Sequence, residues 1–312
     1  MEPWAEIASL ALASNASFHD TVIPLAEMTK LTYTATFGTY FKPEDRNATV
    51  AGWDRDLNLT ENPKAGMRAL FFVQAARGRG VVAFRGTDLN VSGVSGQADR
   101  CADAALFGLS PAAPYCSHFS AETLDYLSGA VHFAERVRTA YPRVSLLFTG
   151  HSLGAGLAFA VAAVLHSQSP HSSLAPSVSF ASPAWLLMLG RKAPHARPTP
   201  AETRRTFYAL ADEWDPVQRD SVHRAGIMGT ECLWTSPEPA ACAACYAQPS
   251  PINGSTPACE LCFAERHVYA HYLKVDVPGG RPACRDVPAQ HLEAAVTARS
   301  GEAATPSERL ID

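Results

Sequence analysis

The sequence predicts an α/β fold, with a mostly parallel central sheet and helices on both of its faces. Strand-like and helix-like segments alternate along the 312 residues, an order that favours parallel strands joined by crossover helices. The β-branched and aromatic run Val144–Thr149 is typical of a buried strand, and the nearly all-apolar run Leu153–His166 is typical of a buried helix. Between them, residues 150–154 read Gly-x-Ser-x-Gly, which predicts a sharp strand-to-helix turn.

The composition fits a single large domain, because 47% of the residues are hydrophobic and 18% are charged. We expect this domain over residues 18–299, followed by a mobile tail at 300–312. The net charge of -4 gives no basic surplus, so nothing points to a nucleic-acid partner. No apolar run reaches the roughly 18 residues needed to cross a bilayer, so no transmembrane segment is predicted.

The cysteines and glycosylation sequons indicate an oxidising compartment. Eight cysteines occur beside five Asn-x-Ser/Thr sequons, a combination that favours secretion or a lumenal location, with the vacuole included. The sequons begin at Asn15, Asn47, Asn58, Asn90 and Asn253. The apolar stretch Trp4–Ala13 lacks the basic residues that open a signal peptide, and we expect the sequence to begin within or just after a removed leader.

In the first part of the chain, Pro24 is expected at the first position of a helix. The apolar residues that follow it at helical spacing are Leu25, Met28, Leu31 and Ala35. Residues 41–65 are polar and carry no predicted element, although Trp53 is expected to dock on the core. Residues 69–74 and 81–84 predict two strands joined by a glycine-containing turn.

Residues 89–117 are rich in glycine, serine and alanine. They are expected to form a long loop without a helix or strand. Loops of this length inside a domain are usually functional, so we expect a lid that uncovers an apolar cleft. The alternative is an inert glycosylated loop, since Asn90 begins a sequon. Cys101 and Cys116 bracket the apolar part of the segment and would staple its base.

Later elements follow the same alternation. Ser120 is expected to begin a helix. Strands are expected at 178–181 and 206–210, and a last strand at 268–277. A closing helix is expected at 291–299.

Residues 232–262 form a cysteine-rich insertion with little periodicity. Its two Cys-x-x-Cys pairs, 242–245 and 259–262, resemble a four-cysteine zinc site. The sequons favour disulfides instead, with free thiols as a third reading. Cys232 and Cys284 would then complete three bridges in this region.

The turn at 150–154 predicts a nucleophile. Ser152 is expected on a strained backbone with its hydroxyl clear of the sheet. Gly150 and Gly154 remove β-carbons that would collide where strand and helix pass. The helix begins at Leu153, whose N–H is aimed at any oxyanion formed beside Ser152.

A serine hydroxyl needs a base, and the base needs a carboxylate to orient it. Asp215 is the preferred carboxylate, because it follows a strand end and Pro216 restricts the backbone after it; otherwise it merely caps a turn. Asp212 is expected to be a solvent-exposed loop carboxylate.

Four histidines follow Asp215 in the sequence. His223 lies in a polar loop, whereas His267 and His271 flank or enter the expected last strand. His291 follows that strand, where a base can lean over the carboxyl edge of the sheet. We therefore expect His291 to be the base, with His267 as the alternative.

Four motifs together resemble the class 3 lipases, the filamentous-fungal type within the α/β-hydrolase fold. They are Phe84-Arg85-Gly86-Thr87-Asp88, the turn at 150–154, Phe180-Ala181-Ser182-Pro183 and Asp215-Pro216-Val217. Their order and spacing are similar to those of the family from about residue 18 to 296.

The resemblance implies roles for individual residues. Ser152 matches the nucleophile, Asp215 the triad acid, and Leu153 and Thr87 the oxyanion-hole donors. Residues 286–292 resemble the family's histidine loop, and residues 267–272 the aromatic strand before it, which favours His291. The cysteine-rich insertion departs from the fungal pattern and is similar to a segment in the vacuolar branch of these lipases.

The sequence thus predicts a serine ester hydrolase that cleaves acylglycerols or related lipids at an interface. Neither a metal nor an organic cofactor is expected. One alternative is a non-lipid esterase of the feruloyl type. The other is a catalytically silent lipid-binding module with the same fold.

Overall fold

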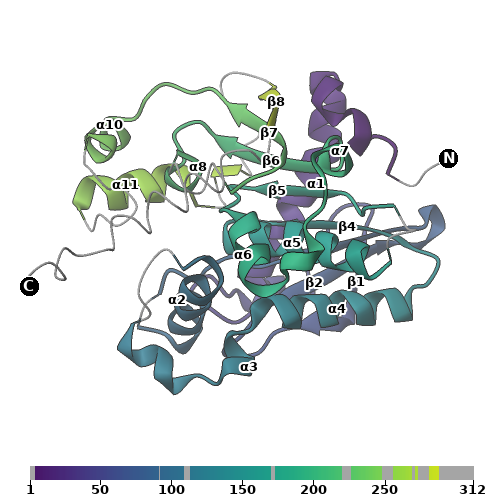
Figure 1. Ribbon diagram of the computed structural model, residues 1–312, viewed down its shortest axis with the longest axis horizontal. Coiled ribbons are helices and arrows are strands. Elements are labelled where there is room, and N and C mark those ends of the chain that lie inside the picture. Colours follow the sequence, from purple (N-terminus) through teal and green to yellow (C-terminus); the bar gives the residue numbers. More distant parts are fainter. Residues whose placement is uncertain are drawn as a thin grey trace, which may run out of the picture.

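The computed structural model describes residues 4–90, 92–108, 113–169, 173–219, 226–247, 256–268, 271–272 and 281–287. Across these residues runs one eight-stranded sheet, whose strands lie side by side in sequence order (Figure 1). The strands are β1 (Asp54–Glu61), β2 (Ala69–Gln74), β3 (Arg79–Phe84), β4 (Ser145–Gly150), β5 (Ser177–Phe180), β6 (Phe207–Asp212), β7 (Gly229–Trp234) and β8 (Ala283–Val287).

The centre of the sheet is parallel. Strands β3 to β7 pair in parallel, while β1, β2 and β8 pair antiparallel at the two edges. In the register of β3 with β4, Phe84 lies opposite Gly150, so both strands end at the same level. Whatever follows these two strand ends is therefore brought together at one edge of the sheet.

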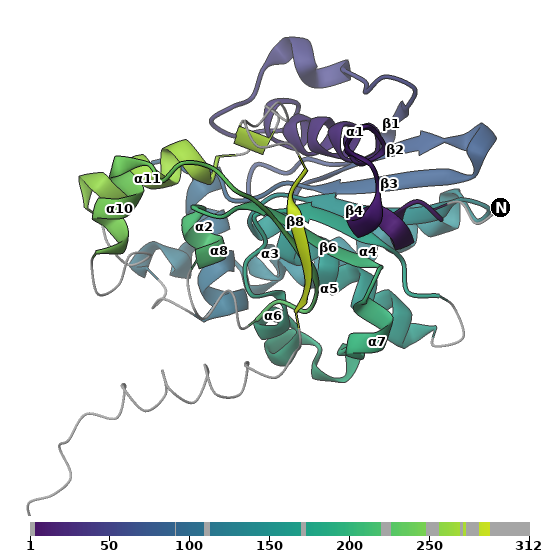
Figure 2. The ribbon, with the colours of Figure 1, turned by 90° about the horizontal axis from the view of Figure 1, so that it is seen from above.

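Helices cover both faces of the sheet, which confirms the predicted fold class. The longer ones are α1 (Asn15–Thr34), α2 (Val94–Phe107), α4 (Tyr126–Ala140), α5 (Leu153–Gln168), α6 (Trp185–Lys192), α10 (Ala240–Tyr246) and α11 (Pro257–Arg266). The shorter ones are α3 (Ala121–Leu124), α7 (Pro200–Thr203) and α8 (Pro216–Arg219). Helix α1 lies on one face and α4, α5 and α6 on the other (Figure 2). Two large apolar cores fill the spaces between sheet and helices.

Helix α1 begins earlier than predicted. Ser14 caps it by accepting a hydrogen bond from the Ser17 N–H, and Pro24 lies inside the helix rather than at its start. The buried side chains of Phe18 and Val22, which precede Pro24, pack in the core. This tertiary contact stabilises the helix through a position where proline removes a backbone donor.

Strand β1 and helix α2 were not predicted. On β1 only Leu59 is buried, so the edge strand lacks an apolar alternation. In α2 the buried stripe consists largely of small residues, a composition that is also common in loops. Its members Ala98, Cys101, Ala102 and Leu106 nevertheless follow helical spacing.

The end of the chain also differs from the prediction. The last described strand is β8, whereas residues 271–272 of the expected strand are helical. The remainder of that expected strand, apart from residue 268, lies outside the described residues. So do the expected closing helix at 291–299 and the tail at 300–312.

Disulfides join all eight cysteines, so the zinc and free-thiol readings were wrong. The bonds are Cys101–Cys116, Cys232–Cys284, Cys242–Cys262 and Cys245–Cys259. The first staples the segment 89–117 as predicted, and the last two tie α10 to α11. In the described part of the chain, no helix has the length and apolarity to cross a membrane.

Candidate active site

The turn between β4 and α5 has the predicted geometry. Ser152 has a positive φ, which is strained for a residue other than glycine, with φ 56° and ψ -127°. A β-carbon on Gly150 would lie 2.4 Å from the backbone of Gly154, and one on Gly154 would lie 2.3 Å from the Phe84 carbonyl oxygen. Glycine is therefore required at both positions, and the strained turn presents the Ser152 hydroxyl beyond the end of the sheet.

His267 joins Ser152 to Asp215. Its Nε2 lies 2.9 Å from the Ser152 Oγ, and its Nδ1 lies 2.9 and 3.0 Å from the two carboxylate oxygens of Asp215. An ionised carboxylate can only accept, so Nδ1 carries the proton and Nε2 accepts from the serine hydroxyl. This is the arrangement in which an imidazole can remove the serine proton.

Asp215 is completely buried at the start of α8. Its carboxylate accepts the N–H of Val217 at 2.8 Å and the hydroxyl of Tyr272 at 2.6 Å. Burial alone would raise the pKa of Asp215, but the charge and hydrogen bond of His267 and the bond from Tyr272 outweigh it and lower the pKa. The carboxylate therefore caps a helix and binds the imidazole at the same time.

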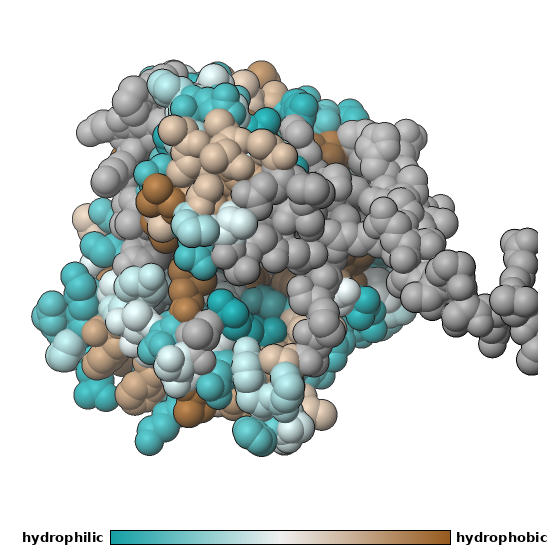
Figure 3. Space-filling model, turned by 90° about the vertical axis from the view of Figure 1, so that its left-hand side faces the viewer, coloured by the Kyte–Doolittle hydropathy of each residue, from teal (hydrophilic) through white to brown (hydrophobic). Residues whose placement is uncertain are grey.

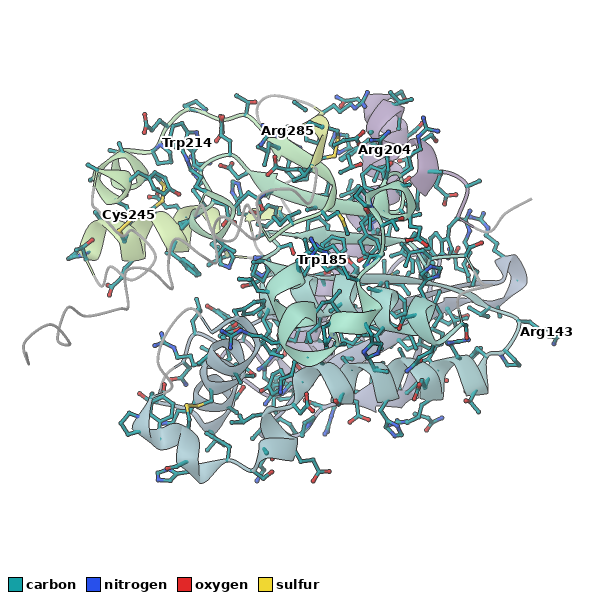
Figure 4. All side chains as sticks on the ribbon, in the orientation of Figure 1. Arg143, Trp185, Arg204, Trp214, Cys245 and Arg285 are labelled. Atoms are coloured by element: carbon teal, nitrogen blue, oxygen red, sulfur yellow. A yellow bond between two sulfur atoms is a disulfide. The ribbon has the colours of Figure 1, made fainter. Side chains whose placement is uncertain are left out.

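His267 directly follows α11, the helix that begins within the cysteine-rich insertion. Helix α11 ends at Arg266, and the His267 N–H still bonds to the Phe263 carbonyl oxygen at 2.9 Å. Trp214, in the loop before Asp215, packs against the four-cysteine cluster of α10 and α11 (Figure 4). The Tyr246 hydroxyl also donates to the Trp214 carbonyl oxygen at 2.6 Å. The two disulfides thus hold α11 against the loop that carries Asp215.

The structure differs from the sequence expectations at this site. His267 was expected to flank or enter a strand, but it directly follows the helix α11. His291, the expected base, lies outside the described residues. Asp212 was expected to be exposed, but it is completely buried and bonded to His271 and Arg266.

His151 also contacts the residues around Ser152, which the sequence did not predict. Burial and the neighbouring His267 lower the pKa of His151 to about 3, so its ring is neutral. Its Nε2–H donates to the His267 carbonyl oxygen, and its Nδ1 accepts the Tyr33 hydroxyl at 2.9 Å. The available signal was its place beside Ser152, because a residue next to the turn must pack against whatever surrounds the serine.

Thr87 follows the end of β3 and lies beside the turn. A β-carbon on Gly86 would be 3.2 Å from the Ser152 Cβ, so the Gly86–Thr87 backbone passes close to the serine. The Thr87 hydroxyl donates to Asp103 of α2 at 2.8 Å. Leu153, on the other side of Ser152, is buried at the first position of α5. These placements bring both predicted oxyanion donors to Ser152.

Asp103→Asn is expected to change how stability depends on pH. Burial, and to a lesser degree the nearby Asp99, raises the pKa of Asp103 to about 7, although the Thr87 hydrogen bond opposes this. Unfolded, the carboxyl ionises near pH 4. Folding therefore resists its ionisation, and this residue's contribution to stability declines as the pH rises from about 4 to about 7.

Urea unfolding between pH 4 and pH 8 checks this expectation. Relative to Asp103→Asn, the wild-type protein should lose unfolding free energy over that window. Asp20→Asn, on the exposed side of α1, is the control and should run parallel to wild type. Parallel curves for all three proteins would contradict the raised pKa.

A small pocket adjoins Thr87 and His267. Its lining is mostly aromatic and aliphatic, and its other members are Tyr33, Tyr40, Leu89, His151, Phe263 and Val268. Figure 3 looks onto this end of the molecule, where hydrophobic residues in brown lie beside hydrophilic ones in teal. His267, which bonds to the Ser152 hydroxyl, thus lines an apolar recess.

Comparison with known proteins agrees with these motifs. Residues 81–188 match the family model of lipase (class 3). A search of curated protein sequences finds no match.

Solved fungal lipase structures also align with the chain. The lipase of Rhizopus microsporus var. chinensis aligns over 71% of this chain and 75% of its own, with a TM-score of 0.44 and 16% identity. Lipase II of Rhizopus niveus aligns over 71% and 82%, with a TM-score of 0.43 and 16% identity. The matched segment 81–188 contains both the Thr87 motif and the Ser152 turn, so over this segment the chain is similar to the class 3 lipases.

Proposed function

We propose that this protein is a serine ester hydrolase that cleaves acylglycerols or related lipids. The observation that carries the proposal is the hydrogen-bonded chain from Ser152 through His267 to Asp215, formed at a strained turn. The match of residues 81–188 to the lipase (class 3) family model supports the same reaction class.

In the proposed reaction the Ser152 Oγ attacks the ester carbonyl carbon while His267 Nε2 takes the hydroxyl proton. The oxyanion is held by the N–H groups of Thr87 and Leu153, each worth about 3 kcal/mol in comparable sites. His267 then donates the proton to the departing alcohol as the ester C–O bond breaks, which leaves the acyl group on the Ser152 Oγ. A water molecule that gives its proton to His267 attacks this acyl group, the bond to Ser152 Oγ breaks, and Ser152 regains the proton from His267 as the acid leaves. Asp215 holds the imidazole tautomer and stabilises its positive charge.

His267 replaces His291 in our assignment of the base. The His267 ring already bonds to both partners that a triad base requires. Its backbone is held as well, by His151 and by the end of α11.

The apolar pocket beside Thr87 favours a substrate with an acyl chain. Segment 89–117 remains our candidate lid, since Leu89 lines this pocket. Within the segment, α2 is anchored by an ion pair between the buried Asp99 and Arg85, so any opening has to pivot on this pair or break it. The intact serine–histidine–aspartate chain disfavours a silent binding module.

We further propose that the protein works in an oxidising compartment, either secreted or lumenal. Four disulfides would not persist among cytosolic thiols. Of the five sequons, four begin at asparagines that are exposed for glycosylation: Asn15, Asn47, Asn58 and Asn90.

Hydrolysis rates on two kinds of ester test the substrate proposal. A lipase should turn over emulsified long-chain triacylglycerol and speed up as the substrate passes from monomers to an interface. A feruloyl-type esterase would instead prefer soluble aromatic or short-chain esters, with no rise at the interface. Absence of hydrolysis of every ester, together with binding to lipid vesicles, would favour the silent module.

A further inference from the structure

Strand β6 ends beside two buried carboxylates, Asp212 and Asp215, and only Asp215 bonds to His267 in the proposed triad. Asp212 is the last residue of β6, and its side chain has no exposed surface. One carboxylate oxygen accepts the Trp214 N–H at 2.8 Å. The other accepts the Ser236 hydroxyl at 3.1 Å. A buried carboxylate of this kind is retained only when its charge is balanced and its hydrogen bonds are made.

The Asp212 carboxylate bonds to residues on both sides of His267. Arg266 Nη1 lies 3.4 Å from the Asp212 Oδ2, and His271 Nε2 lies 3.0 Å from the same oxygen. Arg266 directly precedes His267, and His271 follows it four positions later. Asp212 thus bonds to the chain on both sides of the proposed base.

Tyr272 completes this attachment. Its hydroxyl donates to Asp215 at 2.6 Å and accepts the Asp212 N–H at 3.3 Å. The two carboxylates at one strand end therefore bind four side chains of a single short segment. These side chains are Arg266, His267, His271 and Tyr272.

We propose that Asp212 is a positioning residue, which fixes the segment carrying His267 onto the end of β6 through Arg266 and His271. This inference rests on the proposed function, because it takes His267 to be the base. Asp212 acts through His267, and none of its hydrogen-bond partners named here is Ser152 or Thr87.

The need for such a residue follows from where His267 lies. Helix α11 ends at Arg266, so His267 itself stands outside regular structure. A proposed base has to be held to within about half an ångström of its productive position. An error of about 1 Å typically costs about 100-fold in rate. Paired attachment at Arg266 and His271 restrains the segment on both sides of the ring.

Asp212→Asn tests the proposal. The amide keeps the size of the side chain and can still accept the Trp214 N–H, but it loses the charge that holds Arg266 and His271. With a soluble ester and active sites counted by titration, we expect kcat to fall about 10- to 100-fold with little change in KM.

Glu202→Gln is the matched control. It removes a carboxylate from another histidine pair, His166–Glu202, whose Nε2–oxygen distance is 3.0 Å. His166 lies near the C-terminal end of α5, whereas Ser152 precedes the first residue of this 16-residue helix. The control should retain the wild-type kcat.

A double variant separates positioning from general destabilisation. If Asp212 acts through His267, adding Asp212→Asn to His267→Ala should leave the small residual rate unchanged. An equal further loss in the double variant would overturn the proposal, and so would an Asp212→Asn protein with wild-type kcat. Wild-type turnover by His267→Ala alone would instead refute the proposed base.

His271→Gln provides the same test if Asp212→Asn does not fold. Its side chain is partly exposed, so the substitution is milder. We expect a smaller loss of kcat, again absent when His267 is already alanine. An unchanged kcat in His271→Gln, or a loss that persists without His267, would count against the proposal.

Discussion

Replacing Ser152 with alanine is expected to lower ester hydrolysis by about 10^4-fold or more while the protein stays folded. The reason is that the hydroxyl is the only group lost, and its hydrogen-bond partner is His267 rather than the core. The oxyanion donors and substrate binding alone should still give a small residual rate of hydrolysis, and this rate limits the size of the loss. Initial rates on a soluble ester, with circular dichroism as a check of folding, measure the effect.

Labelling with a fluorophosphonate identifies the nucleophile independently. The label should map to Ser152 and be absent from Ser152→Ala. Ser167→Ala is the matched control, because Ser167 lies near the other end of α5 and its hydroxyl bonds only to the Val164 carbonyl oxygen among the contacts described. A folded Ser152→Ala protein that retains its activity would end the hydrolase assignment at this site.

His267→Ala is expected to be as damaging as Ser152→Ala, and the double variant scarcely worse than either. A serine whose proton has no acceptor loses its nucleophilicity, so removal of either group disables the same step. His291→Ala should retain turnover close to that of the wild-type protein. kcat/KM for the three variants on one soluble ester provides the measurement.

The acid offers a check on the same assignment. Asp215→Asn should lower the rate by a factor of about 10^4, because an amide cannot hold the required imidazole tautomer or stabilise its charge. A folded His267→Ala protein with near-native turnover, beside an inactive His291→Ala, would return the role of the base to His291. Such a result would also require His267 to leave Asp215 during the reaction.

The sequence alone was sufficient for those parts of the site whose signals are local. The turn around Ser152 requires glycine at 150 and 154 because neighbouring backbones pass within a few ångströms. The five-residue motif at 150–154 is enough to recognise this requirement. Asp215 is equally local, because it follows a strand end and is followed by Pro216. The parallel core of the sheet was predictable because strand-like and helix-like segments alternate along the chain.

The sequence could not determine which histidine meets Ser152 and Asp215. The rule that a base follows the last strand favoured His291. In the structure, two disulfides join α11 to α10, and His267 follows the end of α11, where it lies beside Ser152 and Asp215. Pairing among eight cysteines cannot be read from spacing, so the path of this segment could not be predicted.

The burial of Asp212 was likewise decided only by tertiary structure. From sequence it is one carboxylate in an acidic loop, and its partner His271 lies 59 positions away. The contact of His151 with Tyr33 spans 118 positions. Local patterns therefore determined the fold class, the turn at Ser152 and the choice of Asp215. The meeting of His267 with Ser152 and Asp215, its backbone supports and the second buried carboxylate depend on contacts between distant segments, which form only when the chain packs.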